Sequence, residues 1–374
     1  TRLLLDYKEL AESIEDKARL GRYYGWLGFA LFGSGKVREA HAYSSQALKL
    51  GEEIGSYPVI GLAYANLTWT CAELKLLDQG IRYGIEGEKI ARLYELEPMI
   101  FFESLCGMGM IYLFKGNCER NFEIGRKLLE YGESHSNLRS IVVGHIITGY
   151  GHYTNGDFNR AIECCKKAIE LLNDPLFTEW PKLFLCMNYL INDQIEEAED
   201  LIREILPVCE DLGLGYIVSA AQVFRGAVLV AKGRLSEGIK ILEKDLRIFE
   251  DNGRFYSLYA IQTAVAETYF RIATRAQSLK FMDLIKNIGF IITILPFARR
   301  RTEAYLKKII QVGREVESQG FVQGQALLNL GYLHRLKGKA AAARECFSEA
   351  LQIFERCCSE THLQQAREAL ASVS

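Results

Sequence analysis

The sequence predicts an all-α fold, a right-handed α-α superhelix of about eight helix-turn-helix repeats. The first observation is that Leu27–Leu48 aligns without a gap to Leu330–Leu351, with matching Leu-Gly, Gly and Ala-Leu positions. The second is that the same pattern returns along the chain, with a turn position at 35, 75, 116, 156, 193 and 233. The third is an apolar content of 49%, which is enough to bury a continuous core between stacked repeats.

Small residues at fixed places give each repeat its shape. A glycine in the first helix and two alanines in the second allow the paired helices to approach closely. A glycine at the turn ends the first helix in the left-handed conformation. We expect a partial helix over 1–17, repeats over about 18–56, 57–96, 97–137, 138–174, 175–211, 212–251, 252–319 and 320–357, and a capping helix over 358–374.

The pattern resembles the tetratricopeptide repeat, whose usual unit is about 34 residues. The spacing here is near forty, so longer helices or connections are expected in each repeat. Such a single solenoid would present the first helix of each pair on its concave side.

The repeat over 252–319 is interrupted by an insertion at 274–300, after which a second helix is expected from about Thr302. The apolar stretch Ile288–Phe297 is too short to span a bilayer and precedes three arginines. An extra helix or loop packed on the next repeat, a docking element for another domain, and an interfacial membrane anchor all fit this composition.

The GSGK at 33–36 is an incomplete phosphate-binding motif. A P-loop requires G-x-x-x-x-G-K-[ST] between a strand and a helix. Here Val37 follows Lys36, and Ala30 stands where the first glycine should be. With helices expected on both sides, Gly35 is interpreted as the turn glycine of a repeat.

Composition and motifs favour a non-enzymatic protein without cofactor or metal. The 45 Lys and Arg residues balance 47 Asp and Glu residues, so no nucleic-acid partner is indicated. His145 and His152 would share a helix face, but no third ligand accompanies them. The ten cysteines show no C-x-x-C spacing and are interpreted as reduced core thiols of a cytoplasmic protein.

The candidate binding residues are those one and four positions after the glycine of each first helix, which should face the concave groove. They are Phe29, Phe32, Trp69, Met110, Tyr150, Tyr153, Met187, Tyr332 and Arg335. The same rule also selects Ala72, Leu113, Leu190, Ala227, Val230, Thr268 and Arg271. Aromatic and Met side chains suit an apolar peptide or helix. The alternative to a binding groove is that the superhelix coils tightly and buries these side chains against neighbouring repeats.

Several segments are similar to the C-terminal repeats of large prokaryotic class III adenylate/guanylate cyclases that also carry an AAA-type ATPase domain. These are 24–32, 67–81, 156–171 and above all KNIGFIITILPFARRRTEAYLKKII at 286–310. The resemblance implies a regulatory or sensor region, and the start at Thr1 within an apparent helix fits a piece of a longer protein. Neither catalytic domain of that family lies in this chain, so no catalytic residue is carried over.

We therefore expect a cytoplasmic interaction module of a signalling protein. Its partner would be a protein or peptide segment, or its own upstream ATPase and cyclase domains, held in the concave groove. A nucleic-acid partner and an integral membrane segment are not expected. The alternative function is a small-molecule sensor with an apolar ligand in the aromatic-lined groove.

Overall fold

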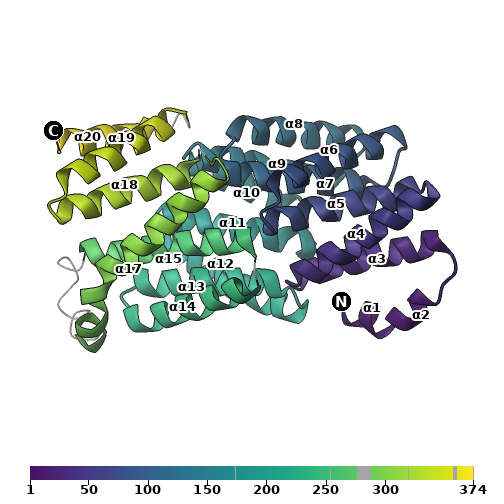
Figure 1. The fold of residues 1–374 in the computed structure, drawn as a ribbon, viewed down its shortest axis with the longest axis horizontal. Coiled ribbons are helices and arrows are strands. Elements are labelled where there is room, and N and C mark those ends of the chain that lie inside the picture. The colour runs from purple at the N-terminus through teal and green to yellow at the C-terminus, as the bar shows by residue number, and fades with distance from the viewer. Residues whose placement is uncertain (173, 253, 276–287, 319, 357–359, 374) are drawn as a thin grey trace.

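The chain forms helices and no strand over the residues that the structure describes, which confirms the predicted all-α class. This computed structural model describes residues 1–374 except 173, 253, 276–287, 319, 357–359 and 374. Figure 1 shows an elongated molecule, with the N-terminal helices at one end and the C-terminal helices at the other.

The helices follow one another at regular intervals. They are α1 (Arg2–Asp6), α2 (Lys8–Glu12), α3 (Lys17–Gly33), α4 (Val37–Ile54), α5 (Tyr57–Glu73), α6 (Leu77–Leu93), α7 (Pro98–Lys115), α8 (Cys118–Ser134), α9 (Leu138–Thr154), α10 (Phe158–Leu171), α11 (Pro175–Ile191), α12 (Ile195–Asp211), α13 (Gly215–Ala231), α14 (Leu235–Asn252), α15 (Phe255–Arg275), α17 (Ile288–Glu315), α18 (Phe321–Leu336), α19 (Ala340–Arg356) and α20 (Glu360–Ala371).

Consecutive helices pack in antiparallel pairs, as the repeat pattern predicts. The pairs within repeats α3–α4, α5–α6, α9–α10 and α18–α19 are among the most extensive contacts in the molecule, and so is α8–α9, which joins two neighbouring repeats. Small residues explain the closeness of these pairs. A Cβ on Gly28 would lie 2.4 Å from Ser44 Oγ, and one on the equivalent Gly331 would lie 2.4 Å from Phe347 Cε1. A larger residue at either position would force the two helices apart.

Residues with positive φ mark the turns. The predicted turn positions Gly35, Lys75, Gly116, Gly156, Asp193 and Gly233 all have φ between 55° and 90°. A second series, which sequence analysis did not predict, lies between repeats: Gly55, Glu95, Ser136, Gly213 and Glu317. The chain thus reverses at a left-handed residue both within and between repeats.

The GSGK segment is one of these turns. It connects the end of α3 to the start of α4, and Gly35 has a φ of 90°. The helices on both sides confirm the interpretation as a helix-helix turn, because a P-loop follows a strand.

The insertion predicted at 274–300 lies partly outside the described residues, at 276–287. Its last part belongs to α17, which begins at Ile288 rather than near Thr302. Thr302 Oγ1 donates a hydrogen bond of 2.7 Å to the Ala298 carbonyl one turn earlier. The helix therefore continues through the position at which sequence analysis started it.

Five cysteines belong to the core, as their apolar surroundings predict. Cys71, Cys106, Cys165, Cys186 and Cys209 are buried and free. Burial raises the thiol pKa of Cys71 and Cys209 to about 12. These thiols are protonated at neutral pH and behave as small apolar side chains.

Candidate functional site

The inner surface of the solenoid is built from the first helix of each pair. Helix α5 contacts α3 and α7, and α9 contacts α7 and α11. Other contacts join repeats that are far apart in the sequence: α15 packs on α5, and α18 packs on α9. The superhelix therefore coils tightly enough to bring early and late repeats into contact.

Four aromatic residues fill the interior where these repeats meet. Phe32 and Trp69 come from α3 and α5, and Trp180 and Tyr216 come from α11 and α13. The ring centroids of Trp180 and Tyr216 lie 5.1 Å apart, and those of Trp69 and Trp180 lie 6.2 Å apart. Phe32 lies 5.7 Å from Trp69 and 6.4 Å from Tyr216. We call these four residues the aromatic cluster.

The indole N–H groups of the aromatic cluster both have acceptors. Trp69 Nε1 donates to Glu103 Oε2 at 2.9 Å, and Trp180 Nε1 donates to the Tyr150 hydroxyl at 2.7 Å. Burial raises the pKa of the Glu103 carboxyl to about 7, although the Trp69 hydrogen bond favours the charged form. This part of the predicted groove is a packed, hydrogen-bonded interior.

An ion pair beside the aromatic cluster closes the superhelix. Arg254 Nη2 lies 3.5 Å from Glu73 Oε1, and the two side chains are 3% and 0% exposed. The Arg254 guanidinium also lies 4.0 Å from the centroid of the Tyr216 ring. A second ion pair, between Lys75 and Glu315, joins the same regions at the surface. We call these two pairs the closure pairs.

A cavity of about 960 Å³ lies farther along the inner surface. Its wall comes from the ends of α9 and α11, from α13, α15 and α18, and from the start of α20. Asn192, Asp193, Glu360 and Gln365 at its wall are exposed to solvent. The cavity is thus accessible from outside the molecule.

One end of the cavity is aromatic. The ring centroids of Phe158 and Phe321 lie 5.0 Å apart, and those of Phe321 and His362 lie 4.6 Å apart. Tyr153 packs on Phe158 at 5.8 Å. Burial lowers the pKa of His362 to about 4, so its imidazole is neutral at physiological pH. We call these four residues the aromatic end.

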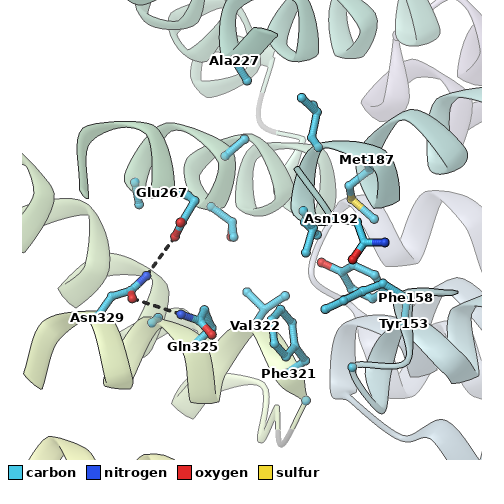
Figure 2. Close-up of a pocket in the computed structure, with 18 of the residues that line it drawn as sticks. Tyr153, Phe158, Met187, Asn192, Ala227, Glu267, Phe321, Val322, Gln325 and Asn329 are labelled. Atoms are coloured by element: carbon cyan, nitrogen blue, oxygen red, sulfur yellow. Dashed lines mark hydrogen bonds between the residues drawn. The ribbon is translucent and has the colours of Figure 1, made fainter. Parts of the chain in front are cut away.

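A chain of polar side chains also lines the cavity, and Figure 2 shows three of its members, Glu267, Gln325 and Asn329, on the side away from Phe158 and Tyr153. Gln325 Nε2 donates to Asn329 Oδ1 at 3.0 Å, and Asn329 Nδ2 donates to Glu267 Oε2 at 2.9 Å. Arg271 Nε donates to Glu267 Oε1 at 3.3 Å, and Arg271 Nη1 donates to Asp193 Oδ1 at 2.7 Å. We call these five residues the polar end. Val322 lies between the two ends in Figure 2.

Two of the nine predicted binding residues, Tyr153 and Met187, line this cavity. Of the further positions that the same rule selects, Leu113, Leu190, Ala227, Val230, Thr268 and Arg271 also line it. The rule therefore finds one wall of the cavity, on α7 to α15.

The other predicted residues lie elsewhere. Phe32 and Trp69 belong to the aromatic cluster, while Met110 and Tyr150 are 0% and 1% exposed. Phe29 is 37% exposed and packs edge-on against Trp26.

The last two predicted residues lie on α18 near the C-terminus. The Tyr332 ring packs on Phe347, and the Arg335 guanidinium lies 5.1 Å from the Tyr332 ring centroid. Arg335 Nη1 also donates to Ser372 Oγ at 2.6 Å. This pair thus contacts α19 and the segment after α20.

Sequence analysis missed the residues that give the cavity its chemistry. Phe158 and Asn192 lie in or beside turns, and Phe321, Gln325 and Asn329 lie on the first turns of α18. The rule selected only two positions in each first helix, so it could not find turn residues. The sequence signal for the polar side of the cavity was the pair Gln325 and Asn329, which lie four residues apart and therefore share one face of α18.

The described residues form neither a metal site nor a membrane-spanning helix. No group of three or more His, Cys, Asp or Glu side chains there is arranged to hold a metal ion. None of the described helices combines the length and apolarity that crossing a membrane requires.

A family model described as the tetratricopeptide repeat matches residues 150–173 and 324–357. The solved structure of a Rap protein complexed with Competence and Sporulation Factor is 11% identical, with 100% of this chain and 93% of that chain covered and a TM-score of 0.52. The apo form of RapI is 14% identical, with 76% and 99% covered and a TM-score of 0.48.

A STAND protein with a tetratricopeptide repeat sensor from Pyrococcus horikoshii is 13% identical, with a TM-score of 0.47. It is matched over 99% of this chain, which spans 53% of that protein. No curated protein sequence matches the chain. The chain therefore contains tetratricopeptide repeats and folds as a solenoid of helix pairs.

Proposed function

We propose that the chain is a cytoplasmic, non-enzymatic interaction module that binds a polypeptide segment of a signalling partner in the cavity. The observation that carries this proposal is the cavity itself, with an aromatic end and a polar end inside one superhelix. Its volume of about 960 Å³ is near the upper limit of ~1,000 Å³ for ordinary small-molecule pockets. A cavity of that size has room for part of a short peptide.

The two ends suit the two parts of a peptide. Carboxamides such as those of Gln325 and Asn329 both donate and accept hydrogen bonds, as a peptide backbone does. The rings of Phe158 and Phe321 supply the apolar surface on which an anchoring side chain is buried. A repeat protein of this fold, the Rap protein, has been solved as a complex with Competence and Sporulation Factor.

The test is selection from a library of short random peptides by the intact chain and by two variants. Ala227→Trp places an indole in the cavity, because Ala227 lies on its wall. Ala42→Trp makes the same change on the exposed surface of α4 and is the matched control. We expect peptides enriched by the wild type and by A42W to be lost with A227W. Enrichment that is equal in all three proteins would contradict the proposal.

A small-molecule sensor is the second candidate, favoured by the buried rings of the aromatic end. The two functions differ in what they require of the polar end. An apolar ligand would raise the thermal unfolding midpoint of wild type and of Asn329→Ala alike. A bound peptide backbone would lose affinity in N329A, because its hydrogen bonds to the carboxamide are lost.

We also propose that the regulated partner includes upstream cyclase and ATPase domains, as the resemblance of 286–310 implies. The support is the sequence similarity of this segment. A pull-down with the chain against such upstream domains tests it, with A227W and A42W as the matched pair. Failure of those domains to bind wild-type chain would refute the intramolecular role. The chain alone is expected to neither hydrolyse ATP nor form cyclic nucleotides.

A further inference from the structure

The cavity wall carries an excess of negative charge. Four carboxylates line it, those of Asp157, Asp193, Glu267 and Glu360, against the single guanidinium of Arg271. Arg160 lies outside the wall and pairs with Asp157 at 3.5 Å. Even with Arg160 included, the formal charge is −2. The wall of the cavity thus carries a net negative formal charge.

The acidic character persists at the polar end after its internal pairing. Arg271 is shared between Glu267 and Asp193, so the three side chains keep one net negative charge. The Glu267 side chain is 38% exposed, and that of Asp193 is 64% exposed. Carboxylate oxygens accept more than one hydrogen bond each, so both residues can take a further donor.

The aromatic end adds no positive charge, and the wall of the cavity also holds a buried donor, the Tyr259 hydroxyl. His362 is neutral there, as described above. Tyr259 lines the cavity with a side chain that is 6% exposed, and its hydroxyl has no hydrogen-bond partner among the described residues. A buried hydroxyl without a partner costs free energy, which an acceptor on a ligand would recover.

We propose that the occupant of the cavity is a basic peptide. Its Lys or Arg side chain pairs with Glu267 and Asp193 at the polar end, and a neighbouring apolar side chain packs on Phe158 and Phe321. The inference rests on the proposed function and adds the charge of the partner. The aliphatic stem of Lys or Arg lies along apolar wall while its head reaches the carboxylates. An acidic segment would be repelled by the same wall.

The test uses three synthetic peptides of equal length with capped ends, which share Leu, Phe and Ala residues. They differ at two positions, which are both Lys, both Gln or both Glu. Binding to the intact chain is measured by calorimetry at low and high salt. We expect the Lys peptide to bind at least about tenfold more tightly than the Gln peptide, with the difference shrinking in high salt.

Two variants locate the charge effect. Glu267→Gln removes the charge and keeps one oxygen, which can accept from either Asn329 or Arg271. Asp193→Asn lies at a turn with φ of 55°, a conformation that asparagine also adopts readily. Each is expected to weaken the Lys peptide by about three- to tenfold and to affect the Gln peptide less. Glu119→Gln, on the exposed surface of α8, is the matched control and should change neither.

The outcomes separate this inference from the proposed function. Equal affinity for the Lys and Gln peptides, or unchanged Lys binding in both variants, overturns the charge preference and leaves peptide binding in place. Tighter binding of the Glu peptide also overturns it. If none of the three peptides binds, or A227W binds them as wild type does, both proposals fail.

Discussion

At the scale of single residues, Glu103 carries a carboxyl group whose charged form is disfavoured by burial. Trp69 Nε1 donates a hydrogen bond of 2.9 Å to its carboxylate, and burial raises the pKa of that carboxyl to about 7. Sequence analysis placed Trp69 on the inner surface but could not predict this partner. Glu103 lies on the next inner helix, and only the packing of α5 on α7 brings the two together.

The raised pKa predicts a stability that depends on pH. Because the folded chain binds the Glu103 proton more tightly than the unfolded chain, the free energy of unfolding should fall as pH rises from about 4.5 to 7. Glu103→Gln keeps the acceptor for Trp69 and removes this loss. At pH 8 we expect E103Q to be more stable than wild type by about 2 kcal/mol, and at pH 4 to be equal.

Urea unfolding followed by circular dichroism at both pH values measures the difference. Glu119→Gln on the surface of α8 serves as the control, because an exposed carboxyl should show no such dependence. Equal stability of E103Q and wild type at pH 8 would show that the carboxyl is well solvated.

At the scale of helices and turns, the left-handed residues determine where each helix ends. The series within repeats could be predicted, because Gly35, Gly116, Gly156 and Gly233 recur at regular spacing. The series between repeats could not, since Glu95, Ser136 and Glu317 are residues without a preference for positive φ. Their conformation comes from the packing of the helices on either side.

Glycine at one of these turns should stabilise the chain. Glu95 has a φ of 48° and an exposed side chain, so Glu95→Gly relieves backbone strain without removing a buried contact. We expect a gain of up to about 1 kcal/mol in the free energy of unfolding. Glu86→Gly, the same change inside α6, should instead cost about 1 kcal/mol. Chemical denaturation of both variants measures the two signs, and a loss in E95G would refute the strain argument.

At the scale of the whole molecule, the solenoid turns until its early and late repeats are in contact. The period of forty residues predicts stacked helix pairs, because neighbours in sequence are neighbours in space. It cannot predict the cavity, because Phe158 and Phe321 meet only through the pitch of the superhelix. Pitch depends on many small packing angles that no local pattern encodes.

The closure pairs should differ in their contribution to the superhelix. Arg254→Ala leaves the fully buried Glu73 without this guanidinium, and we expect a loss of about 3 kcal/mol. Lys75→Ala breaks a pair whose side chains are 37% and 40% exposed and should cost less than about 1 kcal/mol. Hydrogen exchange should accelerate in α5 and α13 of R254A and stay unchanged in K75A. Equal protection in both variants would mean that the buried pair does not hold the turns together.

The tryptophans of the aromatic cluster should also make the fluorescence of the protein sensitive to the conformation of the superhelix. The chain has three tryptophans, and two of them, Trp69 and Trp180, face each other across the meeting point of early and late repeats. Trp26 is 37% exposed and contributes emission that should not depend on that junction. In Trp26→Phe, tryptophan fluorescence, excited selectively over that of the 19 tyrosines, therefore comes only from the junction. A red shift of that emission would report the opening of the superhelix in real time, without any attached label.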